Sequence, residues 1–294
     1  MIRGTTSVLA RESGDAMASE TKQVVSYETG EPYETLIVEV EDRVATVTLN
    51  RPERGNALNA TLHAELGDFW QGARDDDDIW CVIVTGAGRR HFCTGADMRE
   101  AASGAEGRVG QRRVYGLPWP YQFYKPIITA LNGTTAGGGL LFVWESHIVI
   151  AADHVDFLEP HLSVSQLPAG EIYGLANAGL PWPVALRMAL MGTAGERVSA
   201  QRMYDLGLVT EIVPYERLLE RAREIADIVM QMSPLVTRLL LEGAWRMRDG
   251  SLGPSESGRW AHDQQQERGL RDSEDAKEGP RAFVEKRRPV WTGR

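Results

Sequence analysis

Apolar residues recur along the chain at two spacings, and these predict two kinds of element. Apolar and polar residues partly alternate from Leu36 to Val40 and again from Val44 to Leu49, which predicts a β-hairpin. After Asn59, a residue type that caps helices, the apolar residues return at helical spacing. These helical positions are Leu62, Leu66, Phe69 and Trp70. The first part of the chain therefore predicts a hairpin followed by an amphipathic helix.

Three continuous apolar runs follow, and each is typical of a strand buried on both faces of a sheet. They span residues 80–85, 126–132 and 147–151. Strand, turn, strand and helix signals recur around these runs, although the residues themselves do not repeat. Helical spacing then dominates the last third, where Ser233-Pro234 has the form of a helix start. The pattern predicts an α/β fold built from a recurring unit and completed by helices.

The same pattern divides the chain into three parts. Residues 1–32 are polar and carry no apolar core of the signal-peptide kind, so we expect a mobile N-terminal arm. Residues 33–210 hold the recurring unit and the candidate site. Residues 211–294 are expected to form a helical region that makes oligomer contacts.

The composition of the chain excludes several classes of protein. A formal net charge of -9 argues against a general nucleic-acid binder, which needs a basic face, and no apolar run is long enough to span a bilayer. Cys81 and Cys93 are the two cysteines, so no disulfide framework is implied and a cytoplasmic location fits. They have no histidine pattern that would make a zinc site, and we expect no metal.

The most informative stretch runs from Thr134 to Leu141 and contains three consecutive glycines between a predicted strand and a predicted helix. Three glycines in a row lose much backbone entropy on folding, so the stretch needs a structural or functional reason. One interpretation is that a ligand approaches backbone N–H groups at the start of the helix. The other is close packing of the helix on the sheet. The stretch alone does not separate the two.

Several motifs in order resemble the enoyl-CoA hydratase/isomerase (crotonase) superfamily. They are Asn50-Arg51-Pro52, Asn56-Ala57-Leu58-Asn59, Thr94-Gly95-Ala96-Asp97, Ala136-Gly137-Gly138-Gly139, Phe157 with Pro160, Arg197-Val198-Ser199-Ala200-Gln201 with Gly207-Leu208-Val209, and Ser273–Gly279. The resemblance implies a spiral of ββα units with C-terminal helices, assembled as a homotrimer or hexamer. It also implies acyl-CoA thioester substrates, with coenzyme A as part of the substrate and no separate cofactor.

Site residues carried over from this resemblance fall into two groups. The backbone N–H groups of Ala96 and Gly138 would form an oxyanion hole for the thioester carbonyl and its enolate. Such a preorganised donor is typically worth roughly 3–4 kcal/mol in the transition state. The residues along the coenzyme A arm would be Asn56, Ala57, Leu58, Ala96 and Met98.

The chain departs from the family pattern where the two catalytic glutamates of the hydratases are expected. Leu141 and His161 stand at those positions, so efficient enoyl-CoA hydration is not expected. His161 is the best candidate for moving protons because histidine titrates near neutral pH. Glu171 and Glu145 are further candidates, whereas Glu159 is expected to be a loop carboxylate.

These residues lead to three hypotheses. The first is an enzyme that acts on an acyl-CoA, or a related ketone, through a stabilised enolate, by isomerisation, hydrolysis or carbon–carbon cleavage. The second is an acyl-CoA-binding protein without catalysis, since both glutamates are missing. The third is weak residual hydratase activity. Pro160-His161 also resembles 6-oxocamphor hydrolase, a crotonase-fold hydrolase of cyclic β-diketones, and this keeps hydrolysis of such a ketone as an alternative.

Overall fold

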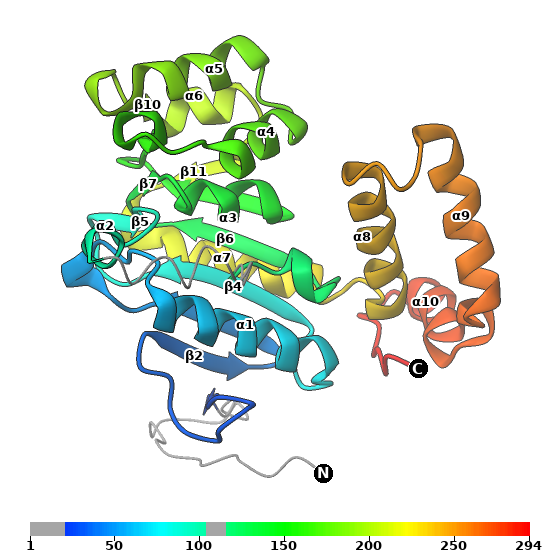
Figure 1. The fold of residues 1–294 in the computed structure, drawn as a ribbon. Coiled ribbons are helices and arrows are strands. Elements are labelled where there is room, and N and C mark those ends of the chain that lie inside the picture. Colours follow the sequence, from blue (N-terminus) through cyan, green and yellow to red (C-terminus); the bar gives the residue numbers. More distant parts are fainter. Residues whose placement is uncertain (1–20, 104–115) are drawn as a thin grey trace. The chain divides into compact units, whose positions relative to one another are not determined.

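The computed structural model describes residues 21–103 and 116–294, and its strands form two sheets (Figure 1). The strands are β1 Lys22–Gln23, β2 Leu36–Glu41, β3 Val44–Leu49, β4 Cys81–Gly86, β5 His91–Cys93, β6 Ile127–Leu131, β7 Thr134–Ala136, β8 Ile148–Ala152, β9 Asp156–Leu158, β10 Val198–Ser199 and β11 Glu211–Val213. The α-helices are α1 Ala60–Asp75, α2 Met98–Ala102, α3 Gly139–Glu145, α4 Ala169–Asn177, α5 Trp182–Met191, α6 Ala200–Asp205, α7 Leu218–Val229, α8 Pro234–Arg248, α9 Pro254–Glu267 and α10 Glu274–Glu285. Short 3₁₀ turns include η1 Pro52–Arg54, η3 Trp119–Tyr121, η4 His161–Val164, η5 Gly192–Ala194, η6 Tyr215–Arg217 and η7 Leu270–Asp272.

The larger sheet has seven strands in the order β1-β2-β3-β4-β6-β8-β11. The strands β1, β2 and β3 pair antiparallel, and every pair from β3 to β11 is parallel. All six residues of β4 and all five of β6 are buried. This burial explains why their sequences are continuously apolar rather than alternating. The predicted hairpin and the three predicted buried strands are therefore confirmed.

The smaller sheet has four strands in the order β10-β9-β7-β5. Each recurring unit gives its first strand to the larger sheet and its second strand to the smaller one. The first unit consists of β4, β5 and α2, the second of β6, β7 and α3, and the third of β8, β9 and η4–α4. This arrangement confirms the α/β spiral of ββα units. It also places the ends of β5, β7 and β9, which pair in parallel, beside one another.

Tyr27 and Glu28, which fall within the predicted mobile arm of residues 1–32, and Tyr33 just after it are bonded to α1 in the structure. The N–H of Tyr27 donates to Asp68 at 2.8 Å, and its hydroxyl donates to Asp76 at 2.8 Å. Tyr33 also donates its hydroxyl to Asp68, at 2.7 Å. A Cβ on Gly72 would lie 2.1 Å from the Tyr27 ring, so the ring packs directly on the helix backbone. The rest of the predicted arm, residues 1–20, lies outside the described residues.

The chain divides into two compact units. Among the described residues, the first comprises those up to Phe123 together with Ile127–Arg223, and the second comprises Tyr124–Pro126 and Glu224–Arg294. The first unit therefore extends beyond the predicted boundary at residue 210. The reason is that β11 pairs with β8 and completes the larger sheet. Trimer or hexamer formation through the C-terminal region stays a prediction.

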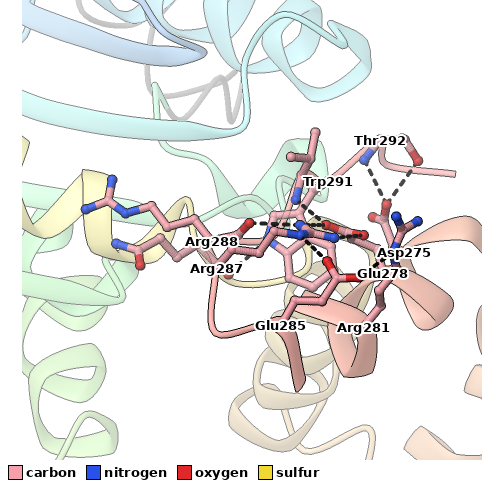
Figure 2. Close-up of polar contacts among 10 residues, drawn as sticks. Asp275, Glu278, Arg281, Glu285, Arg287, Arg288, Trp291 and Thr292 are labelled. Atoms are coloured by element: carbon pink, nitrogen blue, oxygen red, sulfur yellow. Dashed lines mark hydrogen bonds and ion pairs between the residues drawn. The ribbon is translucent and has the colours of Figure 1, made fainter. Parts of the chain in front are cut away.

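In the second unit the chain end folds back on α10 (Figure 2). The buried carboxylate of Asp275 accepts hydrogen bonds from the N–H and hydroxyl of Thr292 and from the N–H of Gly293. Glu278 pairs with Arg287 and also accepts the N–H of Val290. The guanidinium lowers the pKa of Glu278 to about 2.

In both units, within the described ranges, no helix has the length and apolar character that crossing a membrane requires.

Candidate active site

Two glycine-bearing turns meet at the ends of β5 and β7. Gly95 has a φ of +84°, a conformation that favours glycine, and a Cβ added to it would lie 2.8 Å from the nitrogen of Gly138. A Cβ on Gly138 would in turn lie 3.9 Å from the carbonyl carbon of Gly95, the atom bonded to the Ala96 nitrogen. The two backbones are thus in direct contact, and the amides of Ala96 and Gly138 are neighbours.

Both amides lack an acceptor within the described part of the chain. Ala96 is bridged in parallel fashion to Leu58: the N–H of Leu58 donates to Gly95, and the N–H of Asp97 donates to Leu58. Backbone direction alternates along an extended strand, so the Ala96 N–H points away from Leu58. Gly138 is the residue before α3, where a helix leaves its first N–H groups unpaired. Neither N–H donates to a described residue.

The three consecutive glycines serve different purposes. Gly137 adopts a φ of +50° at the turn, and Gly138 supplies the unpaired amide. A Cβ on Gly139 would lie 2.3 Å from the carbonyl oxygen of Cys93, so this glycine allows α3 to pack on β5. Close packing of the helix on the sheet is thus confirmed at Gly139, and approach of a ligand to the Gly138 N–H stays a prediction.

Polar contacts hold the loop before α1, residues 50–59, against the turns that follow β4 and β5. Asn56 is fully buried with a φ of +52°, and its side chain accepts the N–H of Arg51 and donates to the carbonyls of Ala87 and His91. Arg51 also pairs with Asp97 at 2.9 Å. Burial alone would raise the pKa of Asp97, but the Arg51 guanidinium and nearby N–H donors hold it below its usual range. The polar atoms of the Asn56 side chain are thus used in hydrogen bonds that hold the loop in shape.

The other residues predicted for the coenzyme A arm surround this loop. Ala57 and Leu58 are buried, and Leu58 reaches within 3.1 Å of a Cβ position on Gly138. Met98 begins α2 and is 46 % exposed. Leu58 therefore lies beside both Ala96 and Gly138, and contact of these residues with coenzyme A stays a prediction.

His161 begins η4, the short turn after β9, and lies beside the glycine turn. Its Cε1 would be 3.3 Å from a Cβ on Gly137. Its Nδ1 is 2.6 Å from Oε1 of Glu159, and that same oxygen accepts the backbone N–H of His161 at 2.9 Å. Its Nε2 is 3.9 Å from Oε1 of Glu171, in the first turn of α4. The structure thus brings two of the predicted proton-transfer residues, His161 and Glu171, together.

These three side chains perturb one another's protonation. Burial alone lowers the pKa of His161, but the hydrogen bond and charge of Glu159, with the charge of Glu171, raise it above its ordinary value of 6.5. Burial raises the pKa of Glu171 above 4.5, against the opposing effect of His161. Perturbed pKa values of this kind cluster at functional sites.

Glu159, expected to be a loop carboxylate, is fully buried in the structure. The spacing Glu-Pro-His was the available signal, since a carboxylate two residues before a histidine can fold back onto Nδ1. Nitrogen and oxygen atoms of Glu159, His161 and Glu171 lie within 4.8 Å of one another, a separation that admits a metal ion. However, 2.6 Å between Nδ1 and Oε1 is a hydrogen-bond distance, shorter than the roughly 3.3 Å expected between tetrahedral ligands of one zinc ion.

The remaining candidates take other positions. Leu141 is half-buried on α3 and would touch a Cβ on Gly170 at 3.2 Å, so it packs next to Glu171. Glu145 is buried one turn further along, and its Oε2 accepts the N–H of Trp119 at 3.0 Å. This bond gives the buried carboxylate a structural partner, and a role in proton transfer for Glu145 stays a prediction.

A two-sheet ββα spiral whose second strands end at a pair of glycine turns defines the crotonase class of folds. The family model for enoyl-CoA hydratase/isomerase matches residues 39–294. The chain belongs to the enoyl-CoA hydratase/isomerase family.

Named relatives and solved structures agree with this assignment. The chain is 34 % identical over 264 residues to (E)-benzylidenesuccinyl-CoA hydratase of Thauera aromatica, covering 87 % of this chain and 98 % of the relative. It is 33 % identical over 266 residues to carnitinyl-CoA dehydratase of Proteus mirabilis, covering 85 % and 95 %. A crystal structure of an enoyl-CoA hydratase/isomerase from Mycobacterium paratuberculosis matches with a TM-score of 0.78 and 42 % identity, over 89 % of this chain and all of that one. Enoyl-CoA hydratase from Bacillus anthracis matches with a TM-score of 0.79 at 28 % identity, over 89 % of this chain and all of that one.

Proposed function

We propose that this protein is an enzyme that forms an enolate from an acyl-CoA thioester. The observation that carries the proposal is the contact between Gly95 and Gly138, which brings two unpaired amides together with His161 beside them. In the proposal the Ala96 and Gly138 N–H groups bind the thioester oxygen and stabilise the negative charge that develops there. Family membership and relatives named for acyl-CoA substrates support it.

The reaction we favour is addition and elimination across the bond between the α and β carbons. Glu171 takes the proton from the α carbon, and the electron pair moves onto the thioester oxygen as an enolate. The enolate then expels the group on the β carbon, which leaves with a proton from Nε2 of His161. The raised pKa of Glu171 makes its carboxylate a stronger base, and the raised pKa of His161 keeps it charged as an acid nearer neutral pH. This pair would replace the two missing hydratase glutamates.

Substrate binding in the proposal uses the loop before α1. Ala57, Leu58 and Met98 would contact the coenzyme A arm, and the buried Asn56 would hold that loop in shape. Proton transfer through an enolate needs no cofactor beyond the coenzyme A carried by the substrate. Glu145 is outside the proposal because its carboxylate is bonded to the Trp119 N–H.

The test compares turnover and binding in His161→Ala and in a matched control, His154→Ala. His154 is another histidine with a neighbouring carboxylate, Asp153, at 3.5 Å, but its ring contacts the Arg89 carbonyl and Tyr215 instead. We expect His161→Ala to lose roughly 10²–10⁴-fold in kcat on 3-hydroxyacyl-CoA and 2-enoyl-CoA substrates. Calorimetry with a non-reactive acyl-CoA should show nearly unchanged affinity. Unchanged kcat in His161→Ala would remove this residue from the mechanism.

One observation favours a second candidate, hydrolysis of a β-diketone. The Nδ1 of His161 is held by Glu159, so Nε2 is the nitrogen left to take a proton from water. The hydroxide would attack one carbonyl, and the carbon–carbon bond would break to give a carboxylic acid and an enolate that takes the proton back. Release of a carboxylic acid from a cyclic diketone, with no conversion of acyl-CoA, would favour this candidate. Tight binding of acyl-CoA without any product would favour a non-catalytic binder.

A further inference from the structure

Glu159 makes two hydrogen bonds with the same oxygen to the same residue. Oε1 accepts the backbone N–H of His161 at 2.9 Å and lies 2.6 Å from its Nδ1. Pro160 stands between the two residues and leads into η4. These contacts fix both the start of the turn and the rotation of the imidazole ring, because the ring cannot turn without breaking the Nδ1 bond.

The same contacts favour a proton on Nδ1 of His161. A backbone N–H can only donate, so Oε1 acts as an acceptor there, and an ionised carboxylate accepts from Nδ1–H as well. Nδ1 then keeps its proton, and Nε2 is the nitrogen that gains and loses one. Nε2 faces Glu171, at 3.9 Å.

Burial explains why this pairing matters to the charge of both residues. Glu159 is 0 % exposed, and its Oε2 has no hydrogen-bond partner within the described residues. A buried carboxylate with one unsatisfied oxygen is costly unless a positive charge lies beside it. The charged groups that face His161 are Glu159, from the preceding strand end, and Glu171, from α4. The glycine turn that packs against its Cε1 contributes backbone without a charged side chain.

We propose that Glu159 is a positioning residue that holds His161 with Nδ1 protonated and Nε2 directed at the reacting atoms, next to Glu171. The inference rests on the proposed function for its catalytic consequence. Its structural part, the tautomer and the charge of His161, stands independently of any substrate. Glu159 itself touches His161 rather than the substrate in this arrangement.

The experiment follows the ¹⁵N resonances of His161 with pH in the wild-type protein, assigned with His161→Gln among the six histidines. We expect Nδ1 to stay protonated throughout, with Nε2 titrating at a pKa above 6.5. In Glu159→Gln the pKa of His161 should fall, because the adjacent negative charge and its hydrogen bond are gone. Glu159→Asp keeps the charge on a shorter side chain and should recover part of the shift. The matched control, Asp153→Asn, removes the carboxylate beside His154 and should leave His161 unchanged.

Kinetics provide the second measurement. Glu159→Gln should lower kcat by roughly 10²–10⁴-fold with little change in KM, and Glu159→Asp should recover part of the loss. A wild-type His161 whose neutral form carries its proton on Nε2, or a Glu159→Gln protein that titrates like wild type, would overturn the inference. Melting temperatures check that each variant is folded, and the wild-type spectrum decides the tautomer even if a variant does not fold. If wild type converts no thioester, the proposed function fails, while the resonance data still decide the role of Glu159.

Discussion

Replacing Gly95 by alanine would place a methyl group on the Gly138 amide. The added Cβ would lie 2.8 Å from the Gly138 nitrogen, 3.0 Å from the Ala136 carbonyl oxygen and 3.2 Å from the Gly137 Cα. Ordinary van der Waals contact begins at 3.4 Å, so the closest contact is too short by about 0.6 Å. All three neighbours are backbone atoms, so the glycine turn itself would have to move.

The substitution Gly95→Ala should lower both the stability of the fold and the turnover number, by amounts that can be worked out separately. A non-glycine residue at a φ of +84° costs about 1–2 kcal/mol in stability. Overlap in a packed site adds about 1–3 kcal/mol. Displacing an amide by about half an ångström takes it out of productive geometry, and loss of one such donor lowers kcat by about 10²–10³-fold, or about 2.7–4 kcal/mol.

The matched control is Gly207→Ala. Gly207 has nearly the same φ, +81°, but a Cβ there would meet no atom within 4 Å. We expect Gly207→Ala to lose about 1–2 kcal/mol of stability with unchanged kcat, and Gly95→Ala to lose both stability and turnover. The assay is denaturant unfolding together with steady-state kinetics on an acyl-CoA substrate. If Gly95→Ala keeps full kcat, or if both variants lose it equally, the placement of the oxyanion donor at this contact is refuted.

Three further predictions concern the pH dependence of activity, the pH dependence of stability, and the C-terminus. The raised pKa values of Glu171 and His161 predict a bell-shaped profile for elimination, with the acid limb above 4.5 and the alkaline limb above 6.5, and Glu171→Gln should remove the acid limb. Folding raises the pKa of His161, so the charged imidazole contributes its full stabilisation below pH 6.5 and loses it as pH rises through the folded pKa. The substitution His161→Gln should therefore lower the free energy of unfolding most at low pH, as measured by denaturant titration. Asp275→Ala should cost about 1–3 kcal/mol, since the donors of Thr292 and Gly293 lose their buried acceptor, and faster proteolysis of the chain end would report it.

Much of the fold could be predicted because the pattern of apolar residues records burial directly. The continuous apolar sequences of β4 and β6 and the capping position of Asn59 each appear in the structure as predicted. The residues around Tyr27 were missed because their attachment to α1 uses hydrogen bonds to carboxylates rather than an apolar stripe. Such contacts join residues about 40 positions apart, and local sequence does not reveal them.

The candidate site could be predicted in part. Ala96, Gly138, His161 and Glu171 come together, because the motif positions carry the backbone geometry of the family. The Glu-Pro-His spacing is a local signal for the contact between Glu159 and His161, but the full burial of Glu159 has no such signal. A carboxylate in an exposed loop and one in a closed site look the same in the sequence.

The glycine turn between β7 and α3 has a consequence for how such enzymes diversify. Its shape is set by contacts among main-chain atoms, including the approach of Gly139 to the Cys93 carbonyl, so it tolerates almost no change. Leu141, His161 and Glu171 project from the surrounding elements without forming that shape. If the proposed function holds, the groups that move protons can change while the main-chain turn that would bind the carbonyl stays intact, so new reactions can arise without a new architecture.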